Sequence, residues 1–297
     1  MKQGILIIGY KDIQHLIDII EFFNDDEFYY YIHLKKSSKF QPSELERLRS
    51  KKGVMLVSQK FESKWGGINI LKSILYLSEE ALKNKEIEYF HLISSGDFPI
   101  KDAGYFKQFL KENAGKEFLE YVSPPDAKFM KRLTNYYPFD FFNVKEEKGW
   151  GNLYRFVHLQ RKLGLKRRQP AIPNLAVGSA WWTLSRNCLN FVIDQTKKQP
   201  AFLKRLKYTY CGEEFYFQTI LLNSPYKEKL TNDNLRFIDW NTRNGSCPAI
   251  LDESDFFNLI SSNKLFGRKL EAPISTKLTE KIKMHFNVEI KRTGPRS

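Results

Sequence analysis

Apolar segments of strand length alternate with amphipathic segments of helix length from the start of the chain, and this alternation limits the fold more than any other feature. The segment ILIIGY at 5–10 is a continuous apolar run. It is followed by DIQHLIDIIEFF, in which Leu16, Ile19, Ile20 and Phe23 recur at helical spacing, and then by a second apolar run at 28–34. Parallel strands are buried on both faces and read as continuous apolar runs. This β-α-β unit therefore predicts an α/β fold with a mostly parallel sheet flanked by helices.

The same alternation extends along most of the chain. Further strands are predicted at 54–58, 89–94, 117–122, 179–185 and 235–240, and helices at about 68–85, 103–112, 187–197 and 213–222. Between 126 and 173 the periodicity is lost in aromatic and basic sequence, which predicts an insertion of helices and loops. We expect a single domain over 1–271 and a C-terminal appendage over 272–297, with the terminal RTGPRS disordered.

Composition narrows the class of protein. With 297 residues, 42% of them hydrophobic, the chain is long and apolar enough to bury its own core, which excludes a disordered protein. The apolar runs fall short of the roughly 20 residues that cross a bilayer, and the N-terminus lacks a cleavage site, so a soluble cytoplasmic chain is expected. Cys188, Cys211 and Cys247 lack ligand spacing and are predicted to be buried free thiols.

The net charge of +14 should attract anions, including nucleotides, anionic lipid headgroups, acidic glycans and nucleic acids. The cluster Arg161, Lys162, Lys166, Arg167 and Arg168 predicts peripheral contact with an anionic membrane surface. A solvated surface loop is the alternative explanation.

Polar residues directly after the predicted strands are the first candidates for a site, because open α/β sheets bind ligands at the carboxyl ends of their strands. Ordinary turn chemistry is the alternative for Gly96 and Asp97, and a hydrogen-bonded structural role is the alternative for His33 and His91. The segment SSGDFP offers one carboxylate only, and no histidine has a second ligand nearby. No metal site is therefore predicted.

Glu213 and Glu214 open the predicted helix at 213–222. Carboxylates at this position complement the helix dipole, and the same position suits a general base that faces a pocket. The spacing alone leaves both interpretations open.

Seven segments together resemble the core-2/I-branching N-acetylglucosaminyltransferase and xylosyltransferase family, glycosyltransferase family 14. They follow the family's order and span roughly residues 4 to 271: IHLKKS, VSQKFESKWGG, YFHLISSGDFPIK, GSAWWTLSR, GEEFYFQTILLNSPY, LRFIDW and DFFNLISSNKLFGRKLE. The resemblance implies a GT-A fold, an inverting mechanism and independence from divalent metal. The family's acidic-Glu-x-x-x-x-Thr segment falls on Glu213, Glu214 and Thr219, which makes Glu214 the expected catalytic base.

The resemblance also implies residues that bind the donor. Lys269 matches the family's lysine for the diphosphate, and Arg268 is a weaker candidate because adjacent residues tend to point apart. A second family cation falls on Ser246, so Arg243 is expected to replace it. The remaining donor-side candidates lie at strand ends and are Gly9, His33, Ser58, Glu62, Trp65 and Asp97.

On the acceptor side, Glu120 matches a carboxylate that binds acceptor hydroxyls, and Glu213 is expected both to bind the acceptor and to support the base. Trp240 matches a tryptophan that lines the acceptor site, with a core aromatic as the alternative. The basic residues that follow the carboxylate in the family do not register on Lys128, Lys131 or Arg132.

The expected protein is a glycosyltransferase that moves a sugar, N-acetylglucosamine with xylose as the alternative, from a UDP-sugar donor to a hydroxyl of a glycan or lipid-linked saccharide. No cofactor is expected, and nucleic acid is not an expected partner. The alternative function is a non-catalytic basic protein that binds an anionic membrane surface or nucleic acid.

Overall fold

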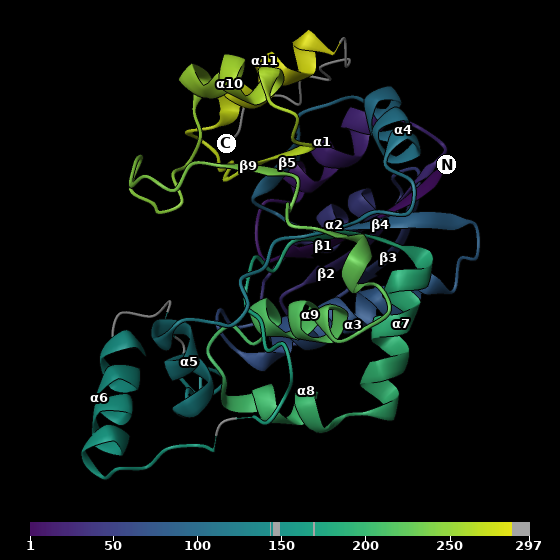
Figure 1. Cartoon of the computed structure of the whole chain (residues 1–297). Helices are drawn as coiled ribbons and strands as arrows, with labels where there is room; N and C mark the ends of the chain where they lie inside the picture. The colour runs from purple at the N-terminus through teal and green to yellow at the C-terminus, as the bar shows by residue number, and fades with distance from the viewer. Residues whose placement is uncertain (143, 145–148, 169, 287–297) are drawn as a thin grey trace.

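A mostly parallel sheet runs through the centre of the molecule in the computed structural model, which describes residues 1–142, 144, 149–168 and 170–286 (Figure 1). In this part of the chain the sheet has seven strands in the order β3-β2-β1-β4-β7-β6-β8, and β7 is antiparallel to both of its neighbours. A second sheet has the order β5-β10-β9. The strands are β1 (Lys2–Gly9), β2 (Phe28–Leu34), β3 (Val54–Ser58), β4 (Ile87–Ser94), β5 (Asp97–Pro99), β6 (Glu117–Leu119), β7 (Trp182–Ser185), β8 (Leu230–Thr231), β9 (Arg236–Ile238) and β10 (Phe266–Arg268).

Helices connect these strands and pack on both faces of the large sheet. They are α1 (Ile13–Phe23), α2 (Pro42–Arg49), α3 (Ile68–Leu82), α4 (Ala103–Glu112), α5 (Ala127–Thr134), α6 (Gly149–Lys162), α7 (Arg186–Lys198), α8 (Ala201–Arg205), α9 (Glu213–Leu222), α10 (Phe256–Ser261) and α11 (Thr276–His285), with short 3-10 turns at Leu206–Tyr208, Lys227–Lys229 and Glu253–Asp255.

The core has one apolar cluster on each face of the large sheet. Because successive strand residues point to opposite faces, Ile5 and Ile7 of β1 pack with α1, α4, α10 and α11, while Leu6 packs with α3, α7 and α9. Figure 1 shows α1, α4 and the last two helices on one side of the sheet, and α3, α7 and α9 on the other. Because helices cover both faces of the sheet, a ligand-binding site is expected at its edges.

One edge of the large sheet collects the carboxyl ends of β1, β2, β3, β4 and β6, because these strands run in the same direction. Gly9, Ser58 and Ser94 end three of these strands, and Glu120 follows β6. The N-terminal end of β7 also lies at this edge, because β7 runs antiparallel to β4. Strand β10 lies beside it, because β10 pairs with β5, which directly follows β4. Segments far apart in the sequence therefore meet here.

The structure confirms the predicted α/β class and places strands and helices where periodicity predicted them. Three strands are shorter than predicted: β6, β7 and β9 cover about half of the segments 117–122, 179–185 and 235–240. The elements that were not predicted are short or polar. Strands β5, β8 and β10 have two or three residues, which is too few to show alternation, and α2 buries only Leu48.

The predicted insertion contains α5 and α6, which lie to one side of the sheet (Figure 1). Within the predicted C-terminal appendage, Leu278 and Ile282 of α11 pack into the same apolar cluster as β1. The segment RTGPRS, predicted to be disordered, lies outside the described residues.

The three cysteines are free in the described structure, and Cys188 and Cys211 are buried as predicted. Cys247 is exposed, which corrects the prediction for that residue, because it lies in a surface loop where its thiol contacts the Trp240 carbonyl. Across the described residues, no helix combines the length and apolar character that a membrane crossing requires.

Candidate active site

Glu214 lies in the first turn of α9, where its carboxylate is tied to a cation. Arg132 of α5 donates to Glu214 Oε2 at 2.8 Å. The same guanidinium donates to the backbone carbonyls of Tyr210 and Cys211, which immediately precede α9. Arg132 is thereby fixed on three acceptors, and it also lies over the ring of Phe215. The Glu214 side chain keeps about 30% of its surface exposed, and no described side chain donates to Oε1. One oxygen is therefore anchored while the other can accept a proton.

Glu213 is adjacent in the chain but has different surroundings. Its side chain is buried, and no described group donates to its Oε2. Burial, followed by the negative charge of Glu214, raises the pKa of Glu213 to about 8. The carboxyl group is therefore largely protonated at neutral pH. Because it is buried, Glu213 is not on an open acceptor surface, and this differs from the prediction that it binds the acceptor directly.

Cys211, Glu213 and Glu214 form a cluster of possible metal ligands, with one ligand atom of each within 4.8 Å of the others. Sequence spacing did not indicate this group. Burial raises the pKa of the Cys211 thiol well above its usual range, and a neutral thiol is a poor metal ligand. The Arg132 guanidinium already supplies a positive charge to Glu214. The donor set therefore fits a cation poorly.

Glu120 follows β6 and faces the same region as Glu214. Burial, together with the charge of Asp233, raises its pKa, and the charge of Glu214 contributes in the same direction. Asn234 donates to its Oε2. Gly178 lies between the two glutamates, because a Cβ placed there would be 1.9 Å from the Glu120 carbonyl oxygen, and its N–H donates to the Glu214 carbonyl at 2.9 Å. The structure thus brings together two of the predicted carboxylates.

Asp97 and Arg268 form an ion pair at the carboxyl end of β4. Arg268 Nη1 lies 3.0 Å from Asp97 Oδ2 and 2.6 Å from Ser94 Oγ, and its guanidinium packs on the ring of Trp181. The N–H and hydroxyl of Ser94 both donate to Asp97 Oδ2 at 2.6 Å. Asp97 is fully buried, so it orders this edge of the sheet rather than presenting an open carboxylate.

Lys269 is next to Arg268 in the chain, and both side chains approach Gly96. Lys269 Cγ lies 3.6 Å and Arg268 Nη1 lies 4.0 Å from a Cβ built on Gly96. Both side chains therefore pass Gly96, while their charged ends have different partners, Asp97 and Ser94 for Arg268. Lys269 Nζ is 2.7 Å from Glu271 Oε1 and 3.5 Å from Ser246 Oγ. Ser246, which stands where the family has its second cation, thus lies beside Lys269.

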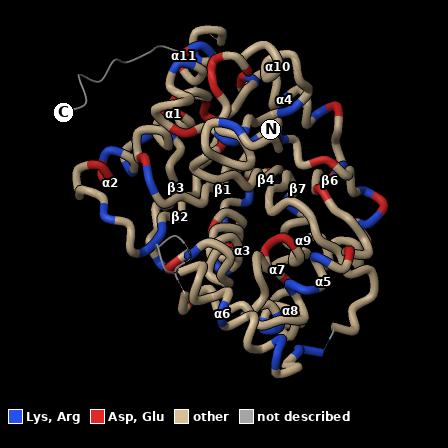
Figure 2. The backbone as a smooth tube through the Cα atoms, turned by 90° about the vertical axis from the view of Figure 1, so that its left-hand side faces the viewer, with Lys and Arg blue, Asp and Glu red and all other residues tan. Residues whose placement is uncertain are grey.

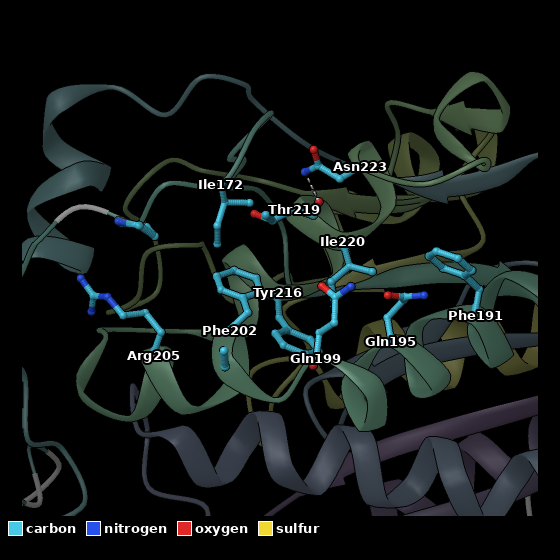
Figure 3. A pocket seen from close by; sticks show the side chains of 12 residues that line it. Ile172, Phe191, Gln195, Gln199, Phe202, Arg205, Tyr216, Thr219, Ile220 and Asn223 are labelled. Atoms are coloured by element: carbon cyan, nitrogen blue, oxygen red, sulfur yellow. Dashed lines mark hydrogen bonds between the residues drawn. The ribbon is translucent and has the colours of Figure 1, made fainter.

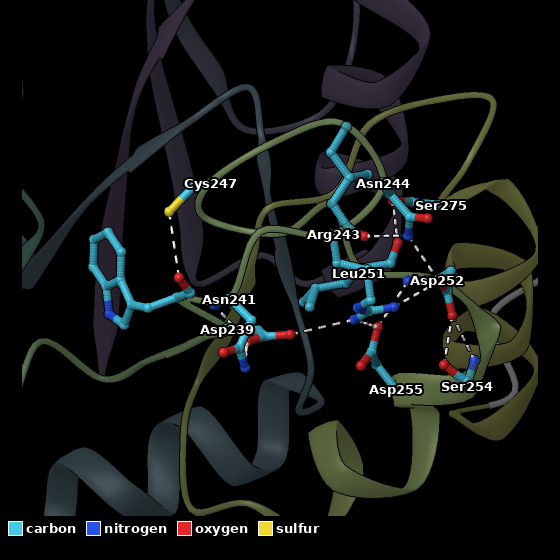
Figure 4. A network of polar contacts seen from close by, with 12 residues as sticks. Asp239, Asn241, Arg243, Asn244, Cys247, Leu251, Asp252, Ser254, Asp255 and Ser275 are labelled. Carbon is cyan, nitrogen blue, oxygen red and sulfur yellow. Dashed lines mark hydrogen bonds and ion pairs between the residues drawn. The ribbon is translucent and has the colours of Figure 1, made fainter.

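Arg243 has a different environment from the one predicted (Figure 4). Its guanidinium contacts the carboxylates of Asp252 and Asp255 at 2.6 Å each, and that of Asp239 at 3.5 Å. Three acidic partners neutralise this charge, so Arg243 is not a spare cation for a diphosphate. It stabilises the 239–255 loop instead.

Two of the remaining donor-side candidates are held inside the protein. His33 is buried in β2, where burial lowers its pKa to about 4, and its Nε2 accepts from the Phe61 N–H at 3.0 Å. A buried neutral imidazole cannot touch a ligand at the surface, so the structural alternative holds for His33. Gly9 is also buried, and a Cβ there would meet Leu34 Cδ2 at 3.2 Å. His91 is likewise structural, with hydrogen bonds to Gln3 and Thr183.

Ser58 and Glu62 stay at the carboxyl edge and are partly exposed. Ser58 Oγ accepts from the Lys60 N–H at 3.3 Å, so this hydroxyl shapes the turn after β3. Glu62 forms an ion pair with Lys35 at 3.0 Å and accepts from the N–H and hydroxyl of Ser37. Burial alone would raise the pKa of Glu62, but these contacts outweigh it and lower the pKa.

Trp65 and Trp240 both expose their rings. Trp240 is 66% exposed, so the alternative of a core aromatic is wrong. Trp65 packs edge-on against Tyr210 with ring centroids 5.3 Å apart, and Tyr210 supplies one of the carbonyls that hold Arg132. The structure thereby connects Trp65 to the Glu214 side of the site rather than to the Arg268 side.

A pocket of about 410 Å³ lies against a different part of α9 (Figure 3). Tyr216 and Ile220 line it from α9, Asn223 lines it just after the end of that helix, and Phe202 and Gln199 line it from the opposite side. The predicted donor and acceptor residues are absent from its lining. Thr219 also borders it, but the Thr219 hydroxyl accepts from the Ala176 N–H at 3.1 Å and so fixes the segment that leads to Gly178.

Sequence reasoning missed two residues of the site, Arg132 and Trp181. Arg132 lies in the insertion without periodicity, where the basic residues do not align with those of the family. Its role depends on a contact with Glu214, 82 positions later in the chain. Trp181 lies in the matched segment GSAWWTLSR, where Trp182 is fully buried and Trp181 is not. Alternation along a strand could have separated these two tryptophans.

Comparison with known proteins agrees with the resemblance seen in the sequence. A family model described as Core-2/I-branching enzyme matches residues 5–259. Xylosyltransferase 2 of Canis lupus familiaris is 26% identical over 94% of this chain and 33% of its own length. Xylosyltransferase 1 of Mus musculus is 26% identical over 84% of this chain and 27% of its own length. The chain thus spans about a third of the length of the curated relatives it matches.

Solved structures are similar over much of the chain at low identity. The crystal structure of S. aureus TarS in complex with UDP is 14% identical, covers 97% of this chain and 71% of that chain, and has a TM-score of 0.41. Core-mannan synthase A of Aspergillus fumigatus is 9% identical, covers 77% of this chain and 72% of that chain, and has a TM-score of 0.39.

Proposed function

We propose that this chain, which belongs to the Core-2/I-branching enzyme family, is a glycosyltransferase that moves a sugar from a UDP-sugar to an acceptor hydroxyl. The observation that carries the proposal is the Glu214 carboxylate, anchored through Oε2 by Arg132 and partly exposed. A general base must be fixed in orientation and have an oxygen available for the proton it takes. Glu214 meets both requirements.

The proposed reaction is a single displacement with inversion at the anomeric carbon. Glu214 Oε1 takes the proton of the acceptor hydroxyl while that oxygen forms its bond to the anomeric carbon. The bond between the anomeric carbon and the UDP oxygen breaks on the opposite face, and UDP leaves with the electron pair. One carboxylate suffices, because no covalent intermediate has to be formed and resolved.

The proposed site for the leaving diphosphate is the edge around Gly96, which the Arg268 guanidinium and the stem of the Lys269 side chain both approach. Positive groups that are already in place stabilise developing negative charge without the need to reorganise. Asp97, Ser94 and Trp181 hold the Arg268 guanidinium, and Glu271 and Ser246 position Lys269. These cations are the basis for proposing transfer without a divalent metal, and Arg243 is not part of this proposal.

The donor sugar is proposed to be N-acetylglucosamine, with xylose as the alternative because the matched relatives are named xylosyltransferases. The proposed acceptor is a glycan or lipid-linked saccharide, bound between Glu120, Glu214 and the exposed ring of Trp240. An indole face suits the C–H surface of a sugar.

The experiment measures release of UDP from UDP-N-acetylglucosamine, UDP-xylose and UDP-glucose, first with water and then with saccharide acceptors, with early product anomers identified by NMR. For the best donor, Glu214→Gln should lower turnover by about 10²–10⁴-fold with little change in UDP affinity. Glu213→Gln is the matched control and should lower turnover much less. Wild-type turnover in Glu214→Gln would rule out this base, and a product that keeps the donor's anomeric configuration would rule out inversion.

A further inference from the structure

We propose that α6 and the basic segment after it form a docking surface for an anionic lipid bilayer. We name this the α6 surface, and it consists of an apolar ridge and a set of cations: Phe156, Leu159 and Leu163, with Arg155, Arg161, Lys162, Lys166 and Arg168. The proposal concerns binding alone and holds whether or not the proposed sugar transfer is correct.

Helix α6 is attached to the protein along one face. Leu153 and Val157 are buried in a small cluster with Phe139. Gln160 donates to the Tyr136 carbonyl and accepts from the Tyr136 N–H, each at 2.9 Å. The helix is therefore held firmly on this face, while Figure 1 shows it at the margin of the molecule. Its other faces are exposed.

The exposed side of α6 carries large apolar side chains at helical spacing. Phe156, Leu159 and Leu163 are separated by three and four residues, so they lie along one side of the helix. Leu159 is 54% exposed and Leu163 is 62% exposed. Nearly half of the large apolar side chains exposed in the described part of the chain fall between residues 136 and 165. An apolar patch of this kind marks a surface that is covered by something else.

The exposed cations of the same helix and of the segment directly after it indicate what covers this ridge. The chain contains no Asp or Glu from 149 to 193, while Arg155, Arg161, Lys162, Lys166 and Arg168 are exposed. Figure 2 marks in blue the Lys and Arg residues along the backbone of α6 and of the segment after it. Helices with aromatic and leucine residues beside lysine and arginine lie in the interface of anionic bilayers. The long basic side chains reach the headgroups while the leucines enter the acyl boundary.

Arg167 does not belong to the α6 surface, although it lies in the middle of the basic run. It donates to the Thr209 hydroxyl at 3.1 Å and to the Arg205 carbonyl, and it packs over the Tyr136 ring. Arg167 therefore fixes the segment to the body. A test that neutralised all five basic residues of 161–168 would disturb the fold together with the surface.

Two other occupants fit the surface less well. Single-stranded nucleic acid is bound by aromatic stacking, and leucines offer no face on which bases stack. In a two-fold dimer the same patch would meet its own copy, which would place cations against cations without acidic partners. Both remain outcomes of the test.

The α6 surface lies next to the candidate active site. Trp150 of α6 packs on Trp65 with centroids 5.6 Å apart, and Trp65 contacts Tyr210, whose carbonyl binds Arg132. Docking through α6 would therefore hold the Glu214 region near the bilayer, where, under the proposed function, a lipid-linked acceptor resides.

The test measures co-sedimentation of the full chain with vesicles of phosphatidylcholine and with an equimolar mixture of phosphatidylcholine and phosphatidylglycerol. Binding should require phosphatidylglycerol and weaken with salt. Replacing Arg161, Lys162, Lys166 and Arg168 together by Gln should lower the partition coefficient by on the order of 10²–10³-fold, since each cation contributes about fivefold. Replacing Leu159 and Leu163 by Ser should lower it by about tenfold. The matched control replaces the exposed lysines Lys197, Lys198, Lys227 and Lys277 by Gln.

The α6-surface variants should keep the melting temperature and the UDP affinity of the wild type. A lower melting temperature would reveal a variant that has lost its fold, and absence of UDP binding in the wild type would reveal a failure of the proposed function alone. Unchanged vesicle binding in the four-cation variant, or an equal loss in the control variant, would overturn the proposal. Tighter binding to an oligonucleotide than to the anionic vesicles, or a dimer in light scattering that the Leu159/Leu163 variant abolishes, would also overturn it.

Discussion

Glu213 and Glu214 are neighbours in the chain, yet the fold gives their carboxyl groups different environments. Glu214 is partly exposed and paired with Arg132, whereas Glu213 is buried beside Cys211. Burial and the charge of Glu214 raise the pKa of Glu213 to about 8. The fold therefore separates two adjacent acids, one partly exposed beside a guanidinium and the other a buried neutral group.

This difference predicts a pH dependence of stability. An unfolded glutamate has a pKa of about 4.3, so between about pH 4.3 and 8 the folded protein holds a proton on Glu213 that the unfolded chain has lost. The free energy of unfolding is therefore highest below this window and falls as the pH rises through it. Glu213→Gln imitates the protonated group and should reduce the loss by at least about 1 kcal/mol between pH 5 and 8, measured by urea unfolding.

The exposed Glu228 provides the control, since Glu228→Gln should follow the pH profile of the wild type. Superimposable profiles of wild type and Glu213→Gln would show that Glu213 is ionised in the folded protein, contrary to the prediction.

At the level of single residues, sequence predicted positions more reliably than partners. Glu214 was assigned to a helix start, and it lies there. Its partner Arg132 is 82 positions away in a segment without periodicity, so no local pattern pointed to it. For Arg243, residue type and register predicted a cation free to bind the diphosphate. The folded loop instead brings three carboxylates to its guanidinium, and no local sequence pattern indicates this arrangement.

Among the structural elements, the segment 176–178 is the one that positions α9 against β6. Val177 and Val122 exchange two backbone hydrogen bonds, and Gly178 lies between Glu120 and the Glu214 carbonyl. A Cβ at Gly178 would be 1.9 Å from backbone, which cannot yield without moving one of the two segments. Gly178→Ala should therefore lower the free energy of unfolding by about 3 kcal/mol or more in thermal or urea unfolding.

Gly151→Ala is the matched control for this substitution. Gly151 lies in α6, and beyond its chain neighbours and the adjacent helix backbone no described atom is within 4 Å of a Cβ built on it. Alanine should stabilise the helix by about 0.5–1 kcal/mol, because it removes the entropic disadvantage of glycine. Equal stability changes in the two variants would contradict the close approach at Gly178.

Long apolar or amphipathic elements were predictable because each carries its own pattern. Strands β1, β2 and β4 and helices α1, α3 and α9 fall where periodicity placed them. Strands β8 and β10 exist because they pair with residues far away, β8 with β6 and β10 with β5. Their two or three residues acquire strand geometry from those partners, and nothing within the segments themselves encodes it.

For the whole molecule, the diphosphate site proposed at Arg268 and Lys269 predicts UDP binding that does not need a divalent ion. Under that proposal these fixed side chains balance the diphosphate charge, so calorimetry should give the same dissociation constant with magnesium and with excess EDTA. Arg268→Gln and Lys269→Gln should each weaken UDP binding by about tenfold or more, while Lys277→Gln, an exposed lysine on α11, should not. Loss of UDP binding on chelation would contradict this arrangement.

The order of the strands also bears on how this edge of the sheet is completed during synthesis. Asp97 forms its ion pair with Arg268, 171 positions later in the chain, and β5 has no partner strand until β10 has been made. At about 5–20 residues per second, a ribosome needs roughly 10–35 s to cover that distance. During this interval the strands β1 to β4 can already pair with one another, but Arg268 and Lys269 have not yet been made. The ion pair that orders this edge of the sheet therefore forms only late in synthesis, after nearly the whole chain has left the ribosome's active centre.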